Sequence, residues 1–173
     1  MMEKSNREKI LSFFLESPTR QFQMREICRL SKISFPSVRA YLICLEKEGL
    51  VSRGSGNVFP YFIANRENKE FKILKINHWR IKIEESGLLD ELRRIYPDCI
   101  ALFGSCARGE DTEKSDLDIF VQSKQRDIPL EKFEKILKRK INVLFEPDLR
   151  KLPKELRNNL ANGIILDGYL KFF

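Results

Sequence analysis

The chain has 173 residues, enough for two small domains with real cores, and its formal net charge is +7. It contains no run of 18 apolar residues and its polar, charged start lacks a signal-peptide pattern, so we expect neither a membrane span nor secretion. The four cysteines form no Cys-x-x-Cys pair. We therefore predict a cytoplasmic protein with reduced thiols, in which Cys28, Cys44 and Cys99 are core residues and Cys106 is exposed.

The first third of the chain predicts three helices followed by a β-hairpin. The helices span residues 6–16, residues 22–30 and the segment from Ser34 to Gly49, and the hairpin strands span residues 50–53 and 58–63. Ser5 is the expected cap of the first helix. Pro36 fits the first turn of the third helix, where its missing N–H is not needed, and Gly49 has the backbone freedom to end that helix.

This order of elements resembles the winged helix-turn-helix of small transcriptional regulators. The sequence LEKEGLV at residues 45–51 is similar to the place where that family's recognition helix runs into the wing. In that fold the third helix enters the major groove of DNA by its N-terminal residues. The DNA-binding residues that the resemblance implies are Arg25, Lys32, Ser37, Arg39 and Arg53.

The positive charge is confined to the first half of the chain. Residues 1–80 carry 15 Lys and Arg against 8 Glu and no Asp, whereas residues 81–173 carry 17 of each sign. A surplus on one half favours an anionic partner for that half, and double-stranded DNA is the partner that we expect. A basic winged helix used only for protein contacts or dimerisation remains the alternative.

Residues 65–86 predict a helix that connects a first domain, residues 1–64, to a second, residues 87–173. The helix carries two apolar stripes, Phe71, Leu74, His78 and Ile81 on one side and Ile73, Ile76, Trp79 and Ile83 on the other. A helix that is apolar on two sides must be covered on both, by the two domains or by a second copy of the chain. A homodimer through residues 65–86 is therefore one expectation, and His78 is expected to be structural.

The second domain predicts strands and helices in alternation. The expected strands span residues 99–103, 117–121 and 141–145, and the expected helices span residues 88–95, 130–140 and 154–162. The tail, residues 163–173, is apolar enough to pack against them. The whole chain is therefore predicted to be an α+β protein.

Two short motifs in this domain carry chemistry. Gly104 lets the backbone turn sharply after a buried strand, and Ser105 opens a short helix whose free N–H groups can hold a phosphate. Asp116 and Asp118 lie two residues apart on an extended segment, so both carboxylates leave the same face. Neighbouring carboxylates repel unless a cation lies between them, and hard oxygen ligands suit Mg²⁺. Together the motifs predict a nucleotide site.

The two motifs resemble the minimal nucleotidyltransferases of the DNA polymerase β superfamily. The shared pattern is Gly-Ser-x-Ala-Arg-Gly, a short loop and Ser-Asp-x-Asp followed by aliphatic residues, and the resemblance covers residues 96–173. It implies a small mixed sheet with helices on one side and an NTP bound with Mg²⁺, for which Mn²⁺ could substitute. By this resemblance Gly104 and Ser105 hold the triphosphate, Asp116 and Asp118 hold the metal, and Arg108 is either a phosphate ligand or a surface residue.

The third strand departs from the family pattern. Members of this kind carry a third acidic residue there, which completes the metal site and helps to deprotonate the attacking hydroxyl, and the matching residue here is Asn142. An amide can ligate weakly through its carbonyl oxygen but cannot accept the proton. Glu146 shares the face of Asn142 but lies roughly 13 Å along the strand, and Asp148 could reach the site from a loop.

Two functional hypotheses follow. The first is a nucleotidyltransferase that moves a nucleoside monophosphate from Mg-NTP to an unidentified protein or RNA acceptor, coupled to a DNA-binding winged helix, with Asp116, Asp118 and Asn142 as its catalytic positions. The second is a DNA-binding regulator or antitoxin whose transferase domain only senses nucleotide or is inactive. The residue at position 142 decides between them.

Overall fold

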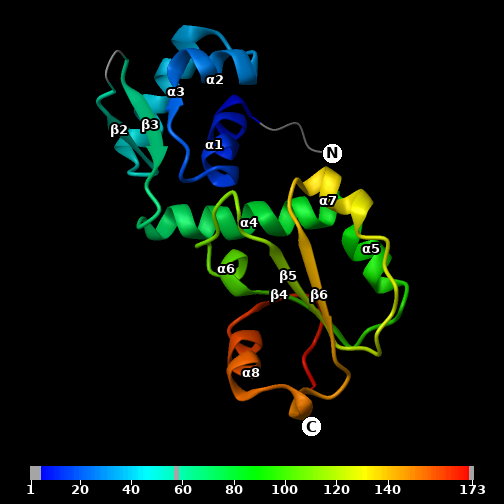
Figure 1. The fold of residues 1–173 in the computed structure, drawn as a ribbon. Coiled ribbons are helices and arrows are strands. Elements are labelled where there is room, and N and C mark those ends of the chain that lie inside the picture. The colour runs from blue at the N-terminus through cyan, green and yellow to red at the C-terminus, as the bar shows by residue number, and fades with distance from the viewer. Residues whose placement is uncertain (1–4, 57–58, 172–173) are drawn as a thin grey trace. The chain divides into compact units, whose positions relative to one another are not determined.

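The computed structural model describes residues 5–56 and 59–171, and its chain divides into two compact units, Met1–Lys75 and Ile76–Phe173 (Figure 1). The division falls inside α4 (Lys69–Glu85), within the segment predicted to connect two domains. Within the described residues no helix is both long and apolar enough to cross a membrane.

Among its described residues the first unit contains three helices, the beginning of α4 and a three-stranded antiparallel sheet. Its elements before α4 are α1 (Asn6–Glu16), β1 (Phe22–Gln23), α2 (Met24–Ser31), α3 (Phe35–Lys47), β2 (Val51–Gly54) and β3 (Tyr61–Ala64), with the strand order β1-β3-β2. The predicted cap of α1 is present as a capping box, in which Ser5 and Glu8 each accept the other's backbone N–H. Gly49 adopts a φ of +72° just after α3, as its predicted role at the helix end requires.

The second helix begins later than predicted. Phe22 and Gln23, expected in that helix, form strand β1 and pair with Phe62 and Tyr61 of β3. Strand pairing satisfies their backbone groups and places the Phe22 ring in the core, 5.2 Å from the ring of Phe14. The turn of the predicted hairpin includes residues 57 and 58, which lie outside the described residues.

A single apolar cluster holds the first unit together. It combines buried residues of α1, α2, α3 and the sheet with Phe71 of α4. Lys75 is also fully buried and donates from Nζ to the carbonyl oxygen of Leu15 at 2.9 Å, close to the C-terminal end of α1. Cys44, predicted to be core, is exposed because it lies off the buried stripe of α3. That stripe consists of Val38, Leu42 and Leu45.

The two apolar stripes predicted along α4 are only partly buried. Phe71, Trp79 and Ile83 are at most 1% exposed, whereas Ile73 is 58% exposed and Ile81 is 53% exposed. Nothing within the described part of one chain therefore covers Ile73 and Ile81, and cover by a second copy stays a prediction. Isoleucine at an exposed helix position is ordinary, and a pattern of apolar letters does not distinguish it from a core position.

The second unit is a four-stranded mixed sheet with helices on it. Its elements after α4 are α5 (Leu88–Arg93), β4 (Cys99–Phe103), α6 (Gly104–Ala107), β5 (Leu117–Val121), α7 (Glu131–Leu137), β6 (Ile141–Phe145), the 3₁₀ helix η1 (Leu149–Lys151), α8 (Lys154–Ala161) and β7 (Ile164–Gly168). The strand order is β6-β5-β4-β7, with β5 and β6 parallel and the other pairs antiparallel. The prediction of an α+β chain with a small mixed sheet is confirmed.

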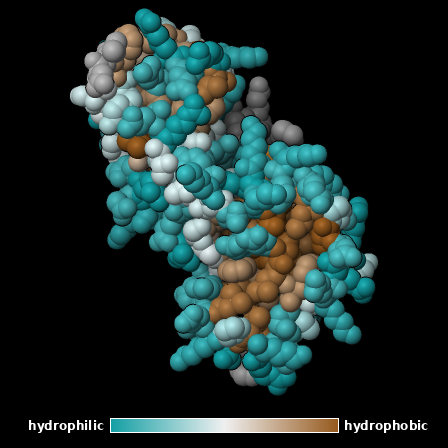
Figure 2. Space-filling model, viewed as in Figure 1, coloured by the Kyte–Doolittle hydropathy of each residue, from teal (hydrophilic) through white to brown (hydrophobic). Residues whose placement is uncertain are grey.

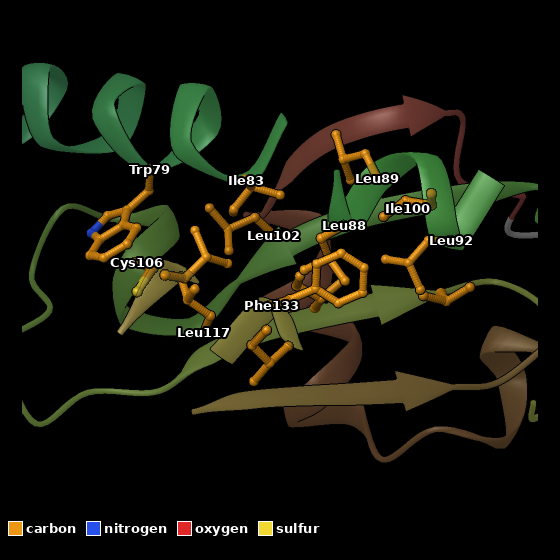
Figure 3. Close-up of a cluster of buried hydrophobic side chains, with 14 of the residues drawn as sticks. Trp79, Ile83, Leu88, Leu89, Leu92, Ile100, Leu102, Cys106, Leu117 and Phe133 are labelled. Atoms are coloured by element: carbon orange, nitrogen blue, oxygen red, sulfur yellow. The ribbon is translucent and has the colours of Figure 1, made fainter. Parts of the chain in front are cut away.

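The sheet separates two apolar clusters. In β4, Ile100 and Leu102 pack with the residues of α4, α5 and α7 shown in Figure 3, whereas Cys99 and Ala101 pack with Leu160 of α8. Helices therefore cover both faces, and the prediction that they lie on one side is wrong for α8. The tail, residues 163–173, was predicted to pack but not to form a strand, and it contains β7. The apolar residues of β7 are consecutive and do not alternate with polar ones, so the sequence pattern did not indicate a strand.

Candidate functional site

The strand β4 ends at a backbone turn that only glycine fits. Gly104 has a φ of +71°, and a Cβ added there would lie 2.5 Å from Oδ2 of Asp118. The contact follows from the sheet register, which pairs Phe103 of β4 with Asp118 of β5. The backbone of the Gly104-Ser105 turn therefore lies directly against one of the two carboxylates identified in the sequence.

The other carboxylate and Asn142 complete the group. The side-chain amide of Asn142 donates to Asp116 Oδ2 at 3.2 Å and to Asp118 Oδ1 at 3.1 Å. The parallel register of β5 and β6 places Asp118 opposite Asn142. Asp116 and Asn142 are exposed and Asp118 is half-buried, so the group is open to a ligand from solvent.

Oxygen donors converge here in a way that fits a divalent cation. One carboxylate oxygen from each aspartate lies within hydrogen-bond distance of the same nitrogen atom, so the two oxygens face one small volume. Mg²⁺ is commonly held by one or two carboxylates together with water and substrate phosphates. No group of three or more His, Cys, Asp or Glu residues suited to a metal occurs among the described residues, because the third position of this site is the amide of Asn142.

The loop between α6 and β5 is tied to both motifs. The backbone N–H of Glu110 donates to the carbonyl oxygen of Ser105 at 3.0 Å, and the thiol of Cys106 donates to the carbonyl oxygen of Asp116 at 3.4 Å. Cys106 is 1% exposed, so the expectation that it is exposed is wrong: its small side chain packs inside the apolar cluster of Figure 3. Arg108 is exposed and pairs with Glu110 at 2.7 Å.

Asp148 is engaged elsewhere. Its carboxylate accepts from Nε and Nη2 of Arg150 at 2.8 and 2.9 Å and caps η1 by accepting the backbone N–H of the same residue. The side-chain hydrogen bonds from Arg150, followed by that backbone bond, lower the pKa of Asp148 to about 2. Asp148 is therefore an anion bound to an arginine, and the structure does not bring it to the aspartate pair.

The residues predicted to contact DNA lie on four segments of the first unit. Arg25 is on α2, Lys32 follows that helix with a φ of +58°, Ser37 and Arg39 are on α3, and Arg53 is on β2. The four basic side chains are exposed. The guanidinium of Arg25 lies 5.6 Å from the centre of the Phe59 ring, and the hydroxyl of Ser37 lies 2.9 Å from that of Ser34.

Sequence reasoning missed Asp111, which is fully buried in the loop after α6. A single aspartate inside a polar loop gives no signal of burial, because aspartate in loops is normally solvated. The only clue in the sequence is the chain's one tryptophan, Trp79, whose indole N–H needs an acceptor once it is buried.

Comparison with known proteins agrees with the geometry of the second unit. Residues 85–167 match the family model described as a nucleotidyltransferase domain, which confirms that part of the resemblance seen in the sequence. The chain is 45% identical over 53 residues to "Putative protein adenylyltransferase MJ1379" of Methanocaldococcus jannaschii, an alignment that covers 26% of this chain and 53% of that protein. The chain thus spans about half the length of this relative. No solved structure matches the chain.

Proposed function

We propose that the second unit transfers a nucleoside monophosphate from an NTP to an acceptor hydroxyl. The observation that carries the proposal is the convergence of the Gly104 turn, Asp116 and Asp118 on one volume open to solvent. The match of residues 85–167 to a nucleotidyltransferase domain supports nucleotidyl transfer in general. We assign this activity to residues 87–173, with residues 65–86 as the connecting segment.

The reaction is an in-line displacement at the α-phosphorus. The acceptor oxygen forms a bond to the α-phosphorus, the bond from that phosphorus to the β-phosphate oxygen breaks, and pyrophosphate leaves. Gly104 and Ser105 would hold the triphosphate through their backbone N–H groups, and Asp116 and Asp118 would hold Mg²⁺ or Mn²⁺. When bound, the cation neutralises phosphate charge and lowers the pKa of the attacking group.

The proton of the acceptor hydroxyl needs a base. Of the three convergent side chains only Asp116 and Asp118 are carboxylates, because Asn142 is an amide that donates to both of them. Both aspartates are assigned to the cation, and a bound cation lowers the basicity of a carboxylate. We therefore expect slow transfer in the natural protein.

The surface beside Asn142 favours a protein acceptor over RNA. On the edge strand β6, Val143 and Phe145 are half-buried against one apolar cluster and Leu144 against the other, and Figure 2 shows hydrophobic residues gathered on the surface of the second unit. Exposed apolar patches suit protein contacts better than a polyanion. The Methanocaldococcus relative is named a putative protein adenylyltransferase, so AMP is the group to test first.

For residues 1–64 we propose a winged helix that binds double-stranded DNA. The support is the order of three helices and a hairpin, the exposed basic residues on α2, α3 and β2, and a charge surplus confined to residues 1–80. DNA binding by this unit would bring the transferase to a particular DNA site.

A second candidate function has its own observation. Because position 142 is an amide, the second unit could bind Mg-NTP without turning it over, and the protein would then be a DNA-binding regulator or antitoxin that senses nucleotide. The two candidates differ in one measurement, which is whether label from the α-phosphate becomes covalently attached to anything.

The test is incubation of the purified full chain with ATP labelled at the α- or the γ-phosphate, with Mg²⁺ or Mn²⁺ and with cell extract. Transfer of AMP predicts protein bands labelled from the α-phosphate only, and none with Asp118→Asn. Label in RNA would identify the other acceptor class. Binding of Mg-ATP without any labelled product under these conditions would favour the sensing function.

A further inference from the structure

Three buried side chains of the second unit meet around Asp111. Trp79 of α4 donates its indole N–H to Asp111 Oδ2 at 3.0 Å, and Nη2 of Arg139 lies 3.9 Å from the same oxygen. The guanidinium of Arg139 also lies 5.2 Å from the centre of the Trp79 ring. The side chains of Asp111 and Arg139 are 0% and 4% exposed, so water does not screen this cluster.

The cluster joins three segments that are distant in sequence. Figure 3 shows Trp79 at one end of the apolar cluster, near Cys106 of α6, with its indole nitrogen directed away from the apolar side chains. Asp111 belongs to the loop that follows α6, and Arg139 precedes β6. A buried charged pair is poorly explained by stability alone, because the free energy lost on removing both charges from water offsets much of the free energy gained from their attraction.

Two of these segments, the loop of Asp111 and the segment of Arg139, also lead into the proposed nucleotide site. The loop of Asp111 runs from the Gly104-Ser105 turn to Asp116, and Glu110 binds the Ser105 carbonyl oxygen. Arg139 lies three residues before Asn142, and the residue between Arg139 and β6 accepts the N–H of Leu117 through its carbonyl oxygen. One buried carboxylate therefore contacts α4 and the segment leading to Asn142, and sits in the chain between the phosphate turn and the aspartates.

We propose that Asp111 is a positioning residue for nucleotide binding, and that Trp79 responds to occupancy of the site through it. This inference rests on the proposed function of the second unit. Asp111 holds the loop at one distance from α4, and the loop in turn sets the spacing between Ser105 and Asp116. A Mg-nucleotide would engage Ser105 through its phosphates and Asp116 through the cation, so its binding would shift the loop, and the hydrogen bond from Trp79 transmits the change.

The test uses the full chain, whose one tryptophan makes its emission a report on this single position. Mg-ATP is titrated while tryptophan emission is recorded, and binding is measured independently by calorimetry. We expect a saturable change in emission with the same midpoint as the heat signal. In Asp111→Asn, which keeps an acceptor for the indole but loses the charge facing Arg139, we expect affinity for Mg-ATP to fall at least fivefold.

A matched control separates positioning from general destabilisation. Leu92→Ala opens the same apolar cluster on α5, at a residue that is 0% exposed, and should lower the melting temperature while changing Mg-ATP affinity less than twofold. An equal loss of affinity in Leu92→Ala would overturn the inference. Where Asp111→Asn does not fold, Trp79→Phe tests the same bond by calorimetry, because it removes the N–H donor together with part of the indole ring, and the same fivefold loss is expected.

The possible failures are distinguishable. Wild-type protein that shows no heat of Mg-ATP binding contradicts the proposed nucleotide site, and the inference falls with it. Wild-type protein that binds Mg-ATP while its tryptophan emission stays constant, and while Asp111→Asn and Trp79→Phe bind equally tightly, leaves the nucleotide site standing and refutes only the role of Asp111.

Discussion

Replacement of Asn142 by aspartate is the most informative single change in this protein. In the natural chain the amide of Asn142 donates to both carboxylates, at 3.1 and 3.2 Å. Asn142→Asp removes two hydrogen bonds to charged acceptors, each worth about 1.5–3 kcal/mol where well buried and less at this exposed position. It also brings a third negative charge to about 3 Å from the other two, which costs roughly another 1–2 kcal/mol with solvent screening.

Together these effects should destabilise the cation-free variant by about 2–4 kcal/mol. For a unit of this size that corresponds to a fall in melting temperature of roughly 8–20 °C. Divalent cations should reverse the loss, because three carboxylates bind Mg²⁺ more tightly than two and a ligand that binds only the folded state stabilises it. Thermal unfolding in EDTA and in Mg²⁺, for the natural chain and Asn142→Asp, measures both effects.

Two control variants make the result specific. Asn142→Ala removes the hydrogen bonds without adding charge, so it should lower stability in EDTA without any gain from Mg²⁺ beyond that of the natural chain. Asn77→Asp makes the same chemical change at an exposed residue of α4 and should leave Mg²⁺ dependence unaltered. If Asn142→Asp melts in EDTA at or above the melting temperature of the natural protein, the three side chains do not interact as described. If Mg²⁺ does not raise its melting temperature, the carboxylates do not share a cation.

The same variant tests catalysis. A third carboxylate supplies the missing proton acceptor, and general-base catalysis is typically worth roughly 10²–10⁴-fold. Once an acceptor is identified by labelling, Asn142→Asp should raise the rate of transfer by that order. The sensing function would be supported instead if Asn142→Asp binds Mg-ATP but labels nothing in cell extract, and if the natural chain also labels nothing in the same extract.

Further predictions concern the site, the arginine-bound carboxylate and the first unit. Asp118→Ala should weaken Mg-ATP binding about tenfold or more by calorimetry, because it removes a metal ligand, and equal binding would contradict the site. Gly104→Ala should lose both binding and stability, since its Cβ would lie 2.5 Å from Asp118 in a left-handed backbone conformation, and unchanged melting and affinity would contradict that geometry. The pKa of Asp148 is lowered to about 2, so its pairing with Arg150 stabilises the fold at pH values above the ordinary aspartate pKa, and this stabilisation is lost as the pH falls towards 2. Thermal unfolding of Asp148→Asn should therefore show a lower stability than the natural chain at neutral pH but not near pH 2. Binding of duplex DNA by the full chain should weaken steeply with salt, and Arg39→Ala should reduce sequence preference more than Arg53→Ala does; salt-independent binding would favour the protein-contact alternative.

The strands that carry the proposed site were predictable because their apolar runs begin and end at residues that favour turns. Gly104 closes one apolar run, and the aspartates alternate with buried Leu117 and Ile119 in another. Strand β1 was not predictable from the sequence. Its two residues, Phe22 and Gln23, directly precede a helix, and they form a strand only because β3 lies beside them. The same holds for β7 and for the burial of Asp111, which depend on partners far away in the sequence.

The backbone positions of the proposed site residues are fixed by packing in the apolar core rather than by contacts among the site residues. Phe103, Asp118 and Asn142 lie opposite one another across β4, β5 and β6, in a row set by strand register. Because strand side chains alternate, a slip of one residue would bury Asp118 and expose Ile119, so the apolar cluster enforces the register. The backbone at position 142 is therefore fixed whether its side chain is an amide or a carboxylate. An amide there changes charge and basicity without moving the strand, so Asn142→Asp tests the proposed chemistry on an unchanged backbone.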